Sequence, residues 1–178
     1  MRNSVIALVA VTIVSMLIGF VWLPSAHSDF TAKGLWDAIC RAAEWLIPYH
    51  LQVIFGALRE HARATQPTTE MLGAVIESLL DRRIYFSYWD ERLHDSLGAP
   101  SDSIARAMLA ICAQVPEGAT ASAMNQAIEP LVPDSVERGK TLKWIVDVLA
   151  NDGYLVEQNG RWRFRSGLIR RYWVRHVV

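Results

Sequence analysis

The sequence predicts a mainly α-helical protein that begins with a membrane-spanning helix and ends in a small unit of helices and one β-hairpin. Three observations support this. Residues 5–23 carry no charged side chain. Apolar residues between positions 48 and 151 recur at helical spacing. Near the C-terminus, two short segments flank Asn159-Gly160, a dipeptide typical of hairpin turns because both residues tolerate positive φ.

Residues 1–28 are predicted to form a transmembrane anchor. The uncharged stretch from 5 to 23 would make a helix of about 30 Å, which is the thickness of the hydrocarbon core. Arg2 precedes the stretch and Trp22 lies at its far edge, an arrangement typical of a single-pass protein with its N-terminus inside. We therefore expect a protein of the bacterial inner membrane. The charge bias is small, so the side on which the soluble part lies stays open.

A cleaved signal peptide is the alternative for this segment. Ala26-His27-Ser28 resembles a small-residue cleavage site. The apolar region of a signal peptide is about 7–15 residues long, which is shorter than the stretch found here. On this length argument we favour the uncleaved anchor.

Residues 48–99 are predicted to form a helical subdomain. Pro48 suits the first turn of a helix, and apolar residues follow it at helical spacing. Thr68 or Thr69 can cap a second helix. A third helix is expected over residues 85–97, where a Gly-Ala-Pro sequence ends it.

Residues 100–178 are predicted to form a winged helix-turn-helix domain. Its first helix is expected to be capped by Ser101 or Asp102. Helices followed by a two-stranded wing are typical of this fold. The remaining predicted elements are helices at 122–128 and 135–151, strands at 154–157 and 161–165, and a last helix with Leu168, Ile169, Tyr172, Trp173 and Val177 on its apolar side.

Three tryptophans in this domain, Trp144, Trp162 and Trp173, are interpreted as packing residues rather than as a stacking platform for a ligand. We expect Trp162→Ala to destabilise the domain by about 3–5 kcal/mol, as a large-to-small change in the core does.

The N-terminal quarter resembles the anchor that precedes the haem domain of some bacterial c-type cytochromes. The matching strings are VWLPS at 21–25 and DFTAKGLWDAICRAA at 29–43, and residues 29–47 would form a juxtamembrane helix. Haem attachment requires Cys-x-x-Cys-His. Here Cys40 is followed by Arg-Ala-Ala-Glu, so the resemblance implies a membrane location and no haem.

Residues 44–178 resemble the C-terminal lid and winged-helix region of prokaryotic P-loop ATPases of the archaeal type, a branch of the AAA+/STAND-like proteins. The matching strings are IPYHLQ at 47–52, YWDERL at 88–93, DGYL at 152–155 and RFRSGLIRRYW at 163–173. The resemblance implies that residues 48–99 are lid-like. The nucleotide-binding core of the family would lie upstream, where this chain has its apolar segment.

No catalytic, cofactor or metal site is predicted. Gly139-Lys140-Thr141 ends like a P-loop, but the glycine that this motif needs five positions earlier is Asp134. The five histidines show no metal-ligand spacing, and two cysteines, Cys40 and Cys112, form no disulfide framework. The chain has 18 basic and 18 acidic residues, so no overall charge favours nucleic acid.

We therefore expect a non-catalytic, membrane-anchored interaction module that binds a protein partner. The alternative is a membrane-tethered winged helix that binds nucleic acid, which we do not favour. A third interpretation of the C-terminal arginines is that they are solvated on an exposed face or pair with acids of the lid-like subdomain. The candidate contacts for a nucleic acid or a protein partner are Lys140, Lys143, Arg161, Arg163, Arg165, Arg170, Arg171 and Arg175.

Overall fold

The computed structural model describes residues 28–63 and 65–178. The predicted membrane-spanning segment, residues 5–23, lies outside these ranges. Within them, no helix combines the length and the apolar character that crossing a bilayer requires.

The described part is mainly α-helical, with a two-stranded antiparallel hairpin before the final helix. The elements are α2 (Ser28–Ala43), α3 (Pro48–Ala62), α4 (Thr69–Asp81), the 3₁₀ turn η1 (Arg83–Tyr85), α5 (Ser87–Leu97), α6 (Ser101–Gln114), α7 (Ala121–Ala127), α8 (Ser135–Asn151), β1 (Leu155–Gln158), β2 (Arg161–Phe164) and α9 (Gly167–His176).

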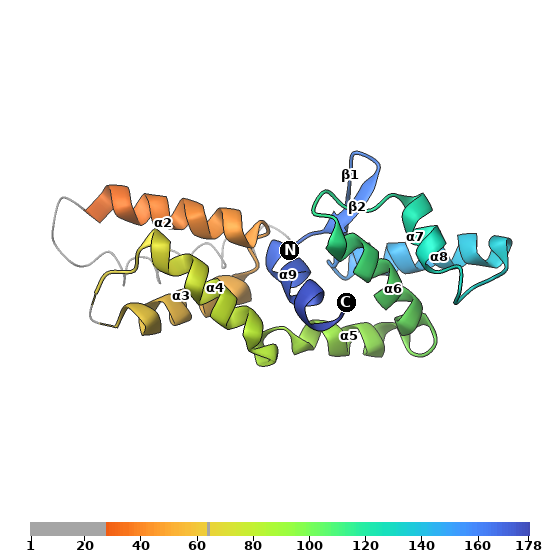
Figure 1. Ribbon diagram of the computed structural model, residues 1–178, viewed down its shortest axis with the longest axis horizontal. Coiled ribbons are helices and arrows are strands. Elements are labelled where there is room, and N and C mark those ends of the chain that lie inside the picture. Colours follow the sequence, from red (N-terminus) through yellow and green to blue (C-terminus); the bar gives the residue numbers. More distant parts are fainter. Residues whose placement is uncertain (1–27, 64) are drawn as a thin grey trace, which may run out of the picture.

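Helix α9 lies between two groups of helices (Figure 1). Helices α2, α3 and α4 form one end of the molecule, and α7 and α8 form the other. Helix α9 packs against α2 and α4 on one side and against α6 on the other. Its Trp173 is fully buried, and one continuous apolar core joins residues from Leu35 in α2 to Trp173. The C-terminal helix therefore joins the two groups into one folded unit.

The hairpin forms where the sequence predicts it, but its first strand is shifted by one residue, so that Gln158 belongs to β1 and Tyr154 does not. Leu155 is opposite Phe164 and Gln158 is opposite Arg161. Asn159 and Gly160 both have positive φ, 54° and 71°, as a tight two-residue turn requires.

A third segment pairs with the hairpin at a single residue. Ala119 forms an isolated bridge with Trp162, in which each backbone N–H donates to the other residue's carbonyl, at 2.9 and 2.8 Å. Gly118 precedes it with φ of 92°, and a Cβ added there would lie 2.5 Å from the Trp162 carbonyl oxygen. The close approach of these two backbones therefore requires glycine at position 118.

The start of α6 differs from the prediction, because neither Ser101 nor Asp102 caps it. The helix already begins at Ser101, after Pro100. The Asp102 carboxylate instead accepts from the Ser103 N–H at 2.8 Å and pairs with the His94 ring at 2.8 Å. It thereby joins the beginning of α6 to α5.

His50 is the central polar residue of an aromatic cluster. Its exposed fraction is 2%, and its ring centroid lies 5.5 Å from that of Phe86 and 6.4 Å from that of Trp89. Neither ring nitrogen has a hydrogen-bond partner within the described ranges. Burial lowers the pKa of His50 to about 4, because the charged imidazolium would lose its hydration.

We expect this histidine to make the protein less stable in mild acid. The unfolded chain has a His50 pKa near 6.5 and takes up the proton first, so stability falls as the pH drops from about 6.5 to about 4. The loss should approach roughly 3 kcal/mol. His50→Leu should flatten the dependence in this window, as measured by urea unfolding at a series of pH values. The same slope in both proteins would show that His50 is not the titrating group.

Candidate interaction surface

The last two candidate arginines of the sequence, Arg171 and Arg175, connect α9 to α4. Both form ion pairs with Glu77. Arg175 also pairs with Asp81 at 2.9 Å and donates to the Glu77 carbonyl oxygen at 3.2 Å. The hydrogen bond from Arg175 lowers the pKa of the Glu77 carboxyl, and the positive charges of Arg171 and Arg175 lower it further. These two guanidinium groups are thus engaged within the protein.

The four other arginines also contact the protein itself. Arg163 pairs with Glu44 at 3.5 Å, and Arg165 lies 4.6 Å above the Trp45 ring. Arg161 donates to the Gly118 carbonyl oxygen at 3.1 Å, and Arg170 donates to that of Ala113 at 3.0 Å. Three of the six arginines therefore pair with acids of residues 44–81, one stacks on an aromatic ring, and two bind backbone carbonyls.

We expect Glu77→Ala to lower the free energy of unfolding by about 1 kcal/mol. The loss is small because these side chains are partly exposed, and it should shrink further in high salt. Urea unfolding at low and high ionic strength measures both effects. The control is Asp147→Ala, which removes an exposed carboxylate of α8 that makes no ion pair within the described ranges. Equal losses in the two variants would show that Glu77 does not stabilise the packing of α9 on α4.

Lys140 and Lys143 lie apart from the arginine contacts, on the exposed side of α8. The Lys140 side chain is 72% exposed, and its nitrogen is 3.9 Å from Glu137. Lys143 is exposed as well. The arginines thus lie along the hairpin and α9 and contact separate parts of the protein, whereas the lysines lie on the exposed side of another helix.

Exposed apolar side chains accompany these lysines. Val136 is 66% exposed, Trp144 is 48% exposed, and Leu131, in the turn before α8, is 50% exposed. Positions 136, 140, 143 and 147 repeat at helical spacing, so Val136, Lys140 and Lys143 share a face. We call Leu131, Val136, Lys140, Lys143 and Trp144 the α8 face. The prediction that Trp144 is a packing residue is wrong, because Trp144 is 48% exposed.

Arg138 fixes the beginning of α8. It donates to the Asn125 side chain at 2.8 Å and to the carbonyl oxygens of Val132 and Pro133 at 2.9 and 2.8 Å. Asp134 caps the helix, because its carboxylate accepts from the Glu137 N–H at 2.8 Å. The turn between α7 and α8 is therefore held by the protein's own groups, which keeps the α8 face preformed. Sequence reasoning missed Arg138, because its partners depend on how the turn folds.

A shallow hollow of about 540 Å³ is lined by α7 and by the partly buried side of α8, away from the α8 face. Its lining residues are Ala121, Ser122, Asn125, Gln126, Glu129 and Leu142.

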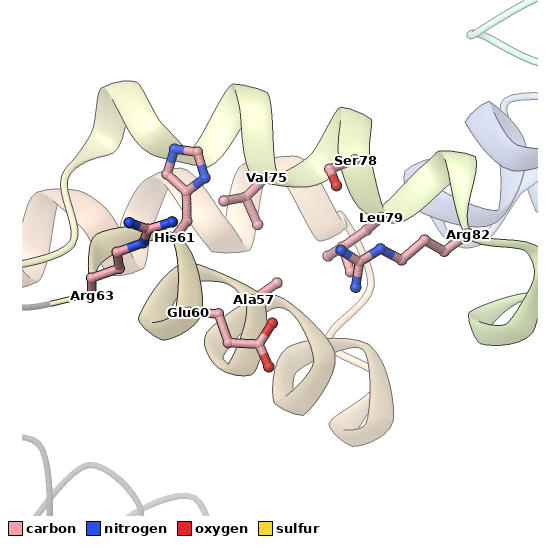
Figure 2. A pocket seen from close by; sticks show the side chains of 8 residues that line it. All are labelled: Ala57, Glu60, His61, Arg63, Val75, Ser78, Leu79 and Arg82. Atoms are coloured by element: carbon pink, nitrogen blue, oxygen red, sulfur yellow. The ribbon is translucent and has the colours of Figure 1, made fainter.

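A second groove, of about 500 Å³, lies between α3 and α4 (Figure 2). It is at the end of the molecule opposite to α8 (Figure 1). Its lining residues are Ala57, Glu60, His61, Arg63, Val75, Ser78, Leu79 and Arg82.

The described residues bring no group of three or more His, Cys, Asp and Glu side chains into an arrangement that could hold a metal ion. Cys40 and Cys112 are free thiols. Burial raises the pKa of the Cys112 thiol to about 11, and burial with the nearby Asp37 raises that of Cys40. Neither thiol is therefore activated as a nucleophile at neutral pH.

Comparison with protein-family models, curated proteins and solved structures finds no match for this chain. The similarities to c-type cytochrome anchors and to the C-terminal region of archaeal-type ATPases therefore rest on the short sequence strings alone.

Proposed function

We propose that this protein is a non-catalytic, membrane-anchored interaction module that binds a protein partner through the α8 face. Residues 5–23 would supply the anchor, and the bacterial inner membrane is the location that their sequence favours. Descent from the C-terminal region of a P-loop ATPase remains a prediction from the matching strings.

The order of elements from α6 onward supports a winged helix-turn-helix for the C-terminal part. Helix α6 is followed by the strand-like pairing at Ala119, then by α7 and α8, and then by the hairpin β1–β2. In this interpretation α8 is the recognition helix and the hairpin is the wing. Helices α3 to α5 would be the lid-like part.

The single observation that carries the proposal is the composition of the α8 face. Val136 and Trp144 are large apolar side chains left in solvent on a helix whose first turn is held by Arg138. Exposed apolar side chains beside polar groups are typical of protein interfaces, and tryptophan is enriched among the residues that dominate binding energy. A preformed surface also loses little entropy on binding.

Nucleic-acid binding is the second candidate, because Lys140 and Lys143 lie on the helix that enters the major groove in winged-helix proteins. The contacts of the arginines argue against it. All six are engaged with other parts of the described protein, as the ion pairs and hydrogen bonds above show. Glu137 and Asp147 further reduce the positive charge of the exposed side of α8.

Site-specific photocrosslinking in membranes of cells that express the full chain would test the proposal. A photoreactive amino acid is placed at Val136 or Trp144, and at Gln158 on the exposed hairpin as the control. We expect a protein adduct of one mass from both α8 positions and none from Gln158. Adducts that nuclease removes, or equal adducts from Gln158, would contradict it.

A further inference from the structure

We propose that the groove between α3 and α4 binds a ligand that carries two phosphate groups joined by a short polar link. This site is separate from the α8 face and does not depend on the function proposed for it.

The groove has a cationic group at each end. Arg63 and His61 lie where α3 ends, and Arg82 lies at the other end, with its guanidinium group directed toward the middle (Figure 2). The two arginines occupy the C-cap positions of α3 and α4. Because these two helices run in opposite directions (Figure 1), their C-terminal ends place Arg63 and Arg82 at opposite ends of the groove (Figure 2).

Within the described residues, Arg63 and Arg82 are exposed and free to contact a ligand. Among the described residues neither Arg63 nor Arg82 forms an ion pair, in contrast to Arg171 and Arg175 on α9. Among the residues that the structure describes, Glu60 is the one carboxylate that lines the groove. The groove therefore has two guanidinium groups and a single carboxylate. The paired N–H donors of a guanidinium group match the spacing of two oxygens of a phosphate group.

The middle of the groove suits the link between the two phosphates. Val75 and Leu79 are each 3% exposed and form an apolar floor that carbon atoms can contact. Ser78 and Glu60 provide a hydroxyl group and a carboxylate for hydrogen bonds to hydroxyls of the link. The volume of about 500 Å³ exceeds what one phosphate ion fills and falls within the range of small-molecule sites.

Two sources share this chemistry, namely the headgroup of a diphosphatidylglycerol lipid and a soluble sugar bisphosphate. The test uses the full chain in zwitterionic micelles and follows the Nε–H signals of its arginine side chains by NMR. The probes are fructose 1,6-bisphosphate, a short-chain diphosphatidylglycerol and inorganic phosphate. If the sugar bisphosphate causes saturable shifts of the Nε–H signals, the ligand is a soluble molecule. If the lipid alone causes them, the ligand is a membrane lipid.

We expect saturable shifts of Arg63 and Arg82 with at least one of the two-phosphate probes, at a concentration at least about tenfold lower than with inorganic phosphate. Arg63→Ala and Arg82→Ala should each weaken binding by about tenfold. The matched controls, Arg59→Ala and Arg83→Ala, change exposed arginines that do not line the groove and should bind normally. Non-saturable shifts, equal shifts at Arg59 and Arg83, or no preference over inorganic phosphate would overturn the proposal.

Discussion

We expect Trp173→Ala to lower the free energy of unfolding by about 3–5 kcal/mol, which is the largest effect among the substitutions considered. The Trp173 side chain is fully buried, and its ring centroid lies 5.9 Å from that of Phe164 and 6.3 Å from that of Tyr154. Removing the indole leaves a cavity where α9 meets the hairpin. Urea unfolding followed by far-UV circular dichroism measures the loss.

Trp144→Ala is the matched control, because this side chain is 48% exposed. It should change the stability by less than about 1 kcal/mol. Trp162, for which the sequence predicted a core-sized loss, is partly buried beside the core, so its truncation should fall between the two. If Trp144→Ala and Trp173→Ala lowered the free energy of unfolding by similar amounts, the packing described for α9 would be contradicted.

Gly118→Ala should destabilise the protein by roughly 3 kcal/mol. Its φ of 92° is a conformation that residues with a side chain rarely adopt, and the added Cβ would lie 2.5 Å from the Trp162 carbonyl oxygen and 2.8 Å from the Arg163 Cβ. To relieve this overlap, the bridge between Ala119 and Trp162 would have to separate. Thermal and urea unfolding measure the loss.

Two other glycines separate the causes of this effect. Gly160 also has positive φ but has nothing within 4 Å of an added Cβ, so Gly160→Ala measures the backbone strain without the overlap. Gly139 lies inside α8 with open space around it, and Gly139→Ala should stabilise the protein by about 0.5–1 kcal/mol. If Gly118→Ala cost no more than Gly160→Ala, the close approach of the two backbones would be absent in solution.

Local sequence signals predicted where most helices and the hairpin lie, but not all of their bounds: α2 ends at Ala43 rather than at 47, and the helix expected over 85–97 is divided into η1 and α5. Helix α8 begins at Ser135 and ends at Asn151 as expected, and Pro48 occupies the first turn of α3. The Asn159-Gly160 turn forms because it requires positive φ at two adjacent residues, and Asn and Gly both tolerate positive φ. Such features depend on short-range geometry, so the sequence alone specifies them.

The roles of the charged residues could not be predicted in this way. Arg171 and Arg175 form contacts with Glu77, which is more than ninety positions away in the sequence. The sequence left open whether the arginines face a ligand or pair internally, since the choice depends on how α9 packs against α4. The exposure of Trp144 and the contacts of Arg138 likewise depend on the tertiary arrangement.

The salt dependence of duplex DNA binding by the full chain tests most directly whether the arginines are internal and the α8 face is the free surface. Each phosphate neutralised contributes about −0.9 to the slope of log K against log salt. We predict weak binding with a slope no steeper than about −2, because Lys140 and Lys143 are the candidate cations left for phosphates. A slope of about −7, as all eight candidate cations would give, would contradict the account and favour a nucleic-acid-binding protein.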